Sequence, residues 1–151
     1  MILLLAAAPV SELRGAIPYG ILVAKLSLTE VLILALLGNL LPVVPLFFGI
    51  QFVLNGLNRF RYTKKFGLWI VETTKRRATI VERYEAIGLA LFVAIPLPMT
   101  GAWTGIIAAS LFKIKFRYAL LAVIIGVFIA GAVVTGLTLS GSELFHLLYQ
   151  R

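Results

Sequence analysis

The chain has 151 residues, of which 61% are hydrophobic and only 13% charged, and its net charge is +8. Soluble domains carry about 25% charged residues, so this deficit, with a mean hydropathy of +1.04, indicates an integral membrane protein. The length leaves no room for a second domain, the absence of cysteine excludes disulfides and thiolate metal sites, and a single histidine, His146, argues against a metal centre.

The first apolar stretch, 2–24, contains helix breakers and a charged pair. Six residues interrupt it: Pro9, Glu12, Arg14, Gly15, Pro18 and Gly20. Its halves of about 8–11 residues are too short to span a membrane and suit a re-entrant hairpin. The opening MILLLAAAP lacks a positive leader, is short for a signal peptide and ends in proline, so we expect it to stay in the mature chain.

The second stretch, 31–57, is long enough to cross a membrane, because a spanning helix needs about 20 residues. Pro42 and Pro45 predict a kink in it. Its polar residues are Asn39, Gln51 and Asn55. Asn39 and Gln51 could line a path or tie helices together, and both roles stay open.

The polar segment 58–85 carries eight Lys or Arg residues against three Glu. Five apolar side chains could form one helical stripe in it: Trp69, Ile70, Ile80, Val81 and Tyr84. We predict a basic amphipathic cytoplasmic helix that lies on an anionic leaflet. Because membrane topology explains the charge, we do not expect nucleic acid as a partner.

The third apolar stretch, 86–112, is broken like the first, here at Pro96, Pro98, Thr100, Gly101 and Gly105. It also predicts a re-entrant hairpin, and the GxxxG of Gly101 and Gly105 favours close packing of its halves. The fourth stretch, 118–139, predicts an unbroken spanning helix. A homodimer could pack closely along its three glycines, Gly126, Gly131 and Gly136.

The distribution of Lys and Arg decides between two topologies. If all four stretches span, nine basic residues lie inside and four outside, with Arg14 in the membrane. If the first and third are re-entrant, segments 58–85 and 113–117 share one side, and the count becomes eleven inside and two outside. Because Lys and Arg favour the cytoplasmic side, we prefer the re-entrant arrangement.

The two halves of the chain resemble each other. PVSELRGAIPYGI (9–21) and PLPMTGAWTGI (96–106) both run from proline through Gly-Ala to Gly-Ile. Each precedes a short charged turn and a long apolar helix with an early glycine, Gly38 or Gly126. One hairpin would enter from outside and the other from inside, which predicts an inverted repeat with a site near the midplane. The match needs two gaps, and coincidence between two apolar segments is the alternative.

Glu12 and Arg14 are the main candidates for that site. A charge in the bilayer costs about 2.5–3.5 kcal/mol on insertion scales, so intramembrane charges usually serve a function. Two positions apart, the pair would not face each other on a regular helix, but at a broken tip both can reach one cavity. Arg14 could bind a phosphate or carboxylate, and Glu12, shielded from water, could carry a proton. The alternative is a structural pair.

The motifs PVSELRGAIPYG (9–20) and PLPMTGAWTG (96–105) resemble the putative small multidrug export protein family, which is similar to a compact DedA/VTT membrane protein. The resemblance covers nearly the whole chain. It implies a lipid-carrier flippase or scramblase with two oppositely inserted re-entrant hairpins, although DedA proteins carry charge in the second hairpin and 96–105 has none. The substrate-binding residues predicted from these motifs are Glu12, Arg14, Gly15, Thr100, Gly101, Trp103 and Thr104.

The sequence therefore predicts an all-α integral membrane protein. A re-entrant helical hairpin and a transmembrane helix occur twice as an inverted repeat, joined by a basic amphipathic cytoplasmic segment. The predicted parts of the single membrane domain are repeat one at 2–57, a linker at 58–85, repeat two at 86–140 and a tail at 141–151. We expect a multi-pass homodimer in a prokaryotic plasma membrane, with segments 58–85 and 113–117 in the cytoplasm.

The expected function is a secondary transporter or lipid-carrier flippase of DedA-like type, open to proton coupling. It would move a small amphipathic or anionic-headed substrate at the hairpin tips, with membrane lipids as further partners and no metal or cofactor. One alternative is a small drug or cation exporter that uses Glu12, and another is a membrane scaffold that does not transport. No Walker motif or nucleophile–base constellation is visible, so we expect neither an ATP site nor an enzyme.

Overall fold

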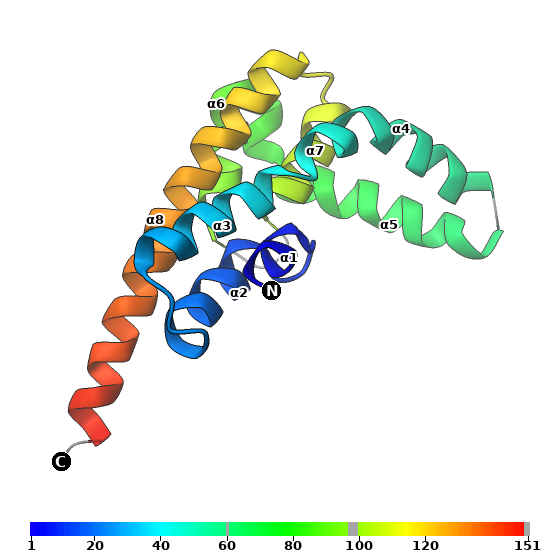
Figure 1. The fold of residues 1–151 in the computed structure, drawn as a ribbon. Coiled ribbons are helices and arrows are strands. Elements are labelled where there is room, and N and C mark those ends of the chain that lie inside the picture. The colour runs from blue at the N-terminus through cyan, green and yellow to red at the C-terminus, as the bar shows by residue number, and fades with distance from the viewer. Residues whose placement is uncertain (60, 97–99, 150–151) are drawn as a thin grey trace.

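The computed structural model describes residues 1–59, 61–96 and 100–149, with the backbone alone described at 51, 53–59, 61–64, 66, 77 and 143–149. Within these ranges the chain is helical and contains no strand, as the sequence predicts. Figure 1 shows a group of short helices near the N-terminus packed against one long C-terminal helix, and a helical pair that projects from this body.

The first apolar stretch forms a helical hairpin. α1 (Ile2–Ala7) ends just before Pro9, which has no N–H with which to continue the helical hydrogen bonds. α2 (Glu12–Pro18) then packs beside α1. Ser11, in the turn, donates its hydroxyl to the Leu5 carbonyl at 2.5 Å. This bond satisfies one of the last carbonyls of α1, which have no partner within the helix.

The sequence predicts further breaks at Pro18 and Gly20, and this prediction is wrong. At Pro18, α2 passes directly into a π-helical turn, η1 (Tyr19–Val23). The Tyr19 N–H still bonds to the Gly15 and Ala16 carbonyls, and the π-helical bond follows from the Ala24 N–H to the Tyr19 carbonyl. α2 and η1 therefore make one continuous arm of the hairpin.

Two helices joined by a kink make up the second apolar stretch. Ser27 and Glu30 form a capping box at the start of α3 (Leu28–Leu40). The Glu30 carboxylate accepts from the Ser27 backbone N–H at 3.1 Å, and the Ser27 hydroxyl accepts from the Glu30 N–H at 3.4 Å. α4 (Val43–Arg59) begins directly after Pro42, so the predicted kink is confirmed.

The sequence predicts one amphipathic helix in the basic segment, and this prediction is wrong, because the chain turns at Ala78. α5 (Arg61–Arg77) packs along α4, and the two form the projecting pair of Figure 1. α6 (Thr79–Ala94) begins within the segment, is kinked at Glu85, whose φ is 46°, and continues into the body. The expected apolar stripe is therefore divided, with Trp69 half exposed on α5 and Val81 buried on α6.

The third apolar stretch forms a second hairpin of the same kind. α6 ends at Ala94, and Thr100 donates its hydroxyl to the Ile95 carbonyl at 2.7 Å, much as Ser11 does in the first hairpin. α7 (Ala102–Leu111) then packs beside α6. After a short turn, α8 (Phe116–Tyr149) follows as the longest helix of the described chain.

Glycines set the closest contacts between the helices. α1 packs on α3 at Gly38, where an added Cβ would stand 2.5 Å from the Leu3 carbonyl oxygen. α6 packs on α8 at Gly126, where an added Cβ would stand 2.7 Å from the Ala90 carbonyl oxygen. Gly105 lets α7 approach α6, which confirms the close packing predicted for the hairpin halves. Because Gly126 is buried within the chain, it is not part of an exposed dimer face.

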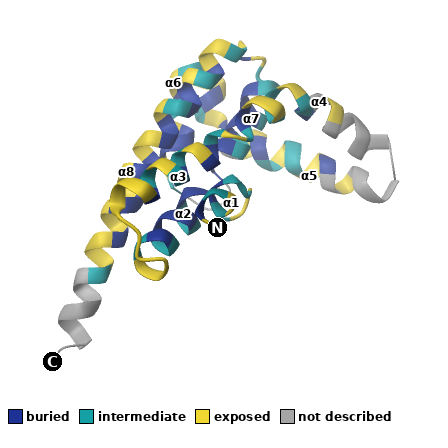
Figure 2. Cartoon of the chain, in the orientation of Figure 1, coloured by how far each residue is buried: buried dark blue, intermediate teal, exposed yellow. Residues whose placement is uncertain are grey.

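The outer surface of α8 is apolar. Leu121, Phe128 and Leu137 are 58%, 55% and 66% exposed, whereas buried residues gather where the hairpins meet the long helices (Figure 2). Soluble monomers rarely expose a large apolar surface. Two stretches of the described chain are also long and apolar enough to cross a membrane, Leu28–Ile50 and Phe116–Ser142.

Candidate functional site

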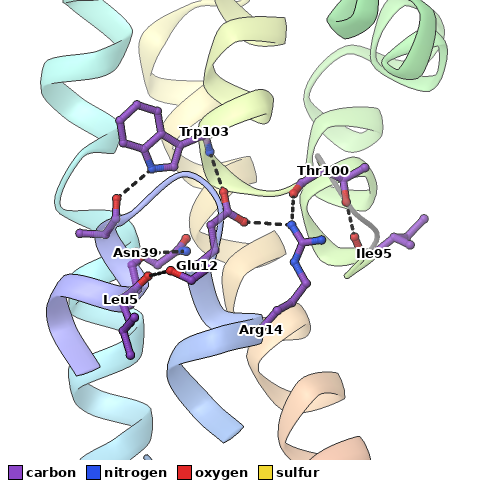
Figure 3. Close-up of polar contacts among 10 residues, drawn as sticks. Leu5, Glu12, Arg14, Asn39, Ile95, Thr100 and Trp103 are labelled. Atoms are coloured by element: carbon purple, nitrogen blue, oxygen red, sulfur yellow. Dashed lines mark hydrogen bonds and ion pairs between the residues drawn. The ribbon is translucent and has the colours of Figure 1, made fainter. Parts of the chain in front are cut away.

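Among the described residues, four polar ones meet where the tips of the two hairpins come together. Glu12 and Arg14 come from the start of α2, Thr100 lies just before α7, and Trp103 lies in the first turn of α7 (Figure 3). The Glu12 and Thr100 residues are only 5% and 8% exposed. Polar groups buried so deeply need hydrogen-bond partners, and these four provide partners for one another.

Glu12, on the first hairpin, caps the N-terminus of α7 in the second hairpin. Its carboxylate accepts a hydrogen bond from the backbone N–H of Trp103 at 3.4 Å. Gly101, just before α7, has a φ of +128°, and a Cβ at this position would overlap the Glu12 carboxylate. The first N–H groups of a helix have no partner in the helix and carry partial positive charge, so a carboxylate is favoured there.

Arg14 connects that carboxylate to the second hairpin. Its Nη2 lies 3.5 Å from the Glu12 Oε2 and donates to the Thr100 carbonyl at 2.7 Å. Residues two positions apart do not face each other on a regular helix. Glu12, however, has a left-handed φ of 46°, and this irregular start of α2 brings the two side chains together.

The end of α1 is held by two other helices. Asn39 of α3 donates its Nδ2 to the Ala6 carbonyl at 3.2 Å, and Trp103 of α7 donates its Nε1 to the Ala7 carbonyl at 3.0 Å. The last carbonyls of a helix have no partner within it, so both bonds satisfy carbonyls that α1 itself leaves unpaired. Asn39 therefore ties helices together in this structure.

Two cavities adjoin the tips. The smaller, of about 10 Å³, lies among Glu12, Arg14, Asn39 and Thr100 and has room for one water molecule. The larger is a groove of about 610 Å³ between the first hairpin and α8. Arg14 borders both cavities, and its side chain is 25% exposed.

The structure brings together most of the residues predicted for the site. The residues that meet at the tips are Glu12, Arg14, Thr100, Gly101 and Trp103. Gly15 and Thr104 are both described and lie outside these contacts, Gly15 on α2 beside Ser11 and Thr104 half-buried on α7. The side chain of Gln51, the other residue proposed to line a path, lies outside the described residues.

The groove residues of α8 are absent from the sequence-based site. Thr138, Gly141 and Ser142 line the groove together with Leu22 of η1. A signal for them exists in the sequence, because residues four apart on a helix share a face and Thr138 and Ser142 are the polar pair near the end of an apolar helix. Nothing in the sequence tells which element lies opposite that face.

Comparison with known families finds one described as "Putative small multi-drug export protein", which matches residues 12–133. The matched range includes both hairpin tips and most of the described helices. Searches of the curated proteins and of the solved structures find no match. Since the family match covers more than half of the sequence, the chain belongs to the family of putative small multi-drug export proteins.

Proposed function

We propose that this chain is a secondary transporter or lipid-carrier flippase of DedA-like type, in which two re-entrant hairpins of opposite orientation meet within the membrane. The observation that carries the proposal is the shared ion pair. Arg14 of the first hairpin donates to the Thr100 carbonyl of the second at 2.7 Å, and Glu12 accepts from the Trp103 N–H. Charged groups at membrane depth are costly and mark substrate paths and proton relays.

The proposed inverted repeat is supported by matching details in the two halves. In each hairpin a hydroxyl beyond the break, Ser11 or Thr100, bonds to a carbonyl before it. In each half a glycine of the long helix, Gly38 or Gly126, lies against a carbonyl of the first hairpin arm. The distance in sequence from Gly38 to Gly126 equals that from Leu3 to Ala90, whose carbonyls they contact, to within one residue. The two halves therefore pair equivalent positions.

The proposed orientation places segments 58–85 and 113–117 in the cytoplasm of a prokaryotic cell, with α3 and α8 crossing the plasma membrane. The chain contains no cysteine, so single cysteines can be labelled without background. Ser27→Cys should react with a membrane-impermeant maleimide from outside the cell. Lys65→Cys and Lys115→Cys should react only after the membrane is opened. Labelling of positions 65 and 115 from opposite faces would contradict the re-entrant arrangement.

The proposed substrate is a small amphipathic or anionic-headed molecule, moved with proton coupling through Glu12 and Arg14. Proteoliposomes with an imposed pH gradient test this proposal. Uptake or release should depend on the gradient and should be lost in Arg14→Ala. Transport by Arg14→Ala at the parent's rate would make the ion pair structural and would support a scaffold. We further propose a homodimer, which mass measurement in mild detergent tests.

The family description, multi-drug export, favours a second candidate. In this candidate the chain exports small drugs or cations and uses Glu12 as the exchange site. The two candidates differ in the sign of the substrate's charge. Export of a lipophilic cation that requires Glu12 and tolerates Arg14→Ala would support the second candidate. Transport of an anion that requires Arg14 would support the first.

A further inference from the structure

The described wall of the groove beside Arg14 comes from three parts of the chain. α2 and η1 supply Pro18 and Leu22, the last part of α8 supplies Leu137, Gly141 and Ser142, and Pro96, just after α6, adds to the wall. Figure 1 shows α2 beside the C-terminal part of α8, in agreement with the contacts between them. The volume, about 610 Å³, falls within the range of about 300–1,000 Å³ typical of small-ligand sites.

The wall of the groove is apolar. The two hydroxyl side chains that line it are already bound to their own helix, since Thr138 donates to the Val134 carbonyl at 2.7 Å and Ser142 donates to the Leu139 carbonyl at 2.8 Å. These hydroxyls are therefore less able to donate to a ligand. The other lining residues of α8 are aliphatic or glycine. The walls suit an alkyl or aryl body better than a sugar or a peptide backbone.

Arg14 is the charged residue at the groove. Among the described residues that line it, Arg14 is the one with an ionisable side chain. Its ion-pair partner Glu12, 3.5 Å away, is nearly buried and is not one of the lining residues. The Glu12 carboxylate also accepts from the Trp103 N–H at the start of α7 (Figure 3). A guanidinium recognises carboxylate and phosphate oxygens. The local charge therefore favours an anionic head and disfavours a lipophilic cation.

We infer that this groove binds a single-chain anionic amphiphile. Its carboxylate or phosphate-monoester head contacts Arg14, and its apolar body lies between α2 and α8. This inference rests on the proposed function, because it names the substrate class of the same site. A head at Arg14 and a tail along the groove also explain why the cation stands at the junction of the two cavities.

The test uses two probes with the same alkyl chain, dodecanoate and dodecyltrimethylammonium. Binding to the full chain in phosphatidylcholine nanodiscs is measured at pH 8 by thermophoresis, with partition into empty discs subtracted. We expect dodecanoate to bind at least about tenfold more tightly, which corresponds to roughly 1.4 kcal/mol. Equal binding of the two probes, or tighter binding of the cation, would overturn the inference. Arg14→Gln should remove the preference.

A matched pair of glycine variants keeps the test independent of Arg14. An added Cβ meets nothing within 4 Å at either Gly141, which lines the groove, or Gly136, which is exposed on the same helix outside it. Gly141→Leu should fill the groove and weaken dodecanoate binding by about tenfold or more, a change of roughly 1.4 kcal/mol. Gly136→Leu should bind like the parent. Unchanged binding by Gly141→Leu would place the ligand elsewhere and refute the inference.

A last experiment distinguishes a single-chain ligand from a bilayer lipid. Nanodiscs that contain phosphatidylglycerol present the same anionic chemistry on two chains. Dodecanoate affinity should be unchanged in them, and strong competition would assign the groove to membrane lipid and overturn the single-chain inference. Failure of the proposed function gives a different result. Dodecanoate binding without gradient-dependent transport would support the groove site and contradict the proposed transport function. Transport without dodecanoate binding would support the transport function and contradict the groove site.

Discussion

The carboxylate of Glu12 accepts a hydrogen bond from the backbone N–H of Trp103 at 3.4 Å, across 91 residues of sequence. Glu12 of the first hairpin thus caps α7, the second arm of the second hairpin. Because the same carboxylate also contacts Arg14, which binds the Thr100 carbonyl, the two tips are joined through both members of one ion pair. Separating the tips would take the Thr100 carbonyl from Arg14 and the Trp103 N–H from Glu12.

Glu12→Gln should bind the anion and lose the pH dependence of binding. In the parent, an ionised Glu12 competes with the anion for Arg14, so anion binding should weaken as the pH rises, and proton uptake should accompany binding by linkage. Glutamine keeps an oxygen for the Trp103 N–H but takes up no proton. Binding of dodecyl sulfate, whose head stays ionised throughout, measures the effect between about pH 5 and 8, a range chosen from the shifts seen for buried carboxyls.

The control for this variant is Glu30→Gln. Glu30 is the exposed carboxylate of the capping box of α3 and is not one of the residues that meet at the hairpin tips. It should leave the pH profile of the parent unchanged. A Glu12→Gln profile that follows the parent would show that a different group takes up the proton.

Gly101→Ala should destabilise the protein and reduce ligand binding. The glycine has a φ of +128°, which disfavours any residue with a Cβ, and that Cβ would overlap the Glu12 carboxylate. An alanine at an incompatible positive φ costs more than about 1 kcal/mol. Thermal unfolding in nanodiscs should show a lower Tm. Gly136→Ala, at a position with open space, should stay close to the parent. A parental Tm for Gly101→Ala would mean that the tips relax without cost.

Gly38→Ala and Gly126→Ala should destabilise the protein to a similar degree. Each added methyl group would stand against a carbonyl oxygen of the first hairpin arm, that of Leu3 or Ala90. Overpacking of this kind costs about 1–3 kcal/mol. The free energy of unfolding, measured for both variants under one condition, compares the two contacts. A large loss in one variant and none in the other would argue against equivalent halves.

Trp103→Phe should lower stability by about 0.5–1.5 kcal/mol, the usual worth of one hydrogen bond. The substitution keeps the aromatic ring but removes the Nε1 donor to the Ala7 carbonyl. Trp69→Phe measures what the same substitution costs elsewhere, on α5 and away from the tips. If both variants unfold at the same midpoint as the parent, the contact between α7 and the end of α1 contributes little.

Helix boundaries could be predicted from the sequence where proline and glycine set them. The break near Pro9, the kink at Pro42 and the break before Gly101 all occur where these residues stand. Each is a local effect, because a missing N–H or a positive φ acts on the backbone directly. Pro18 shows the limit, since the helical arm continues past it as a π-helical turn.

The contacts of the site depended on distant parts of the chain and were harder to predict. The motifs identified Glu12 and Trp103 as candidates, but not that one caps the helix of the other. The groove was missed altogether, because it requires Leu22 and Gly141 to face each other across two elements. Gly126 was assigned to a dimer face, whereas its space is taken by α6 of the same chain. Spacing along one helix does not reveal which neighbour occupies its face.

The bond from Trp103 to Ala7 has a consequence for synthesis, because 96 residues separate the two. A growing chain emerges from its N-terminus, so the first hairpin is made long before the residue that completes it. Until the start of α7 has been made, the Ala7 carbonyl and the Glu12 carboxylate lack these partners. The first hairpin can therefore complete its contacts only when the second half of the chain arrives.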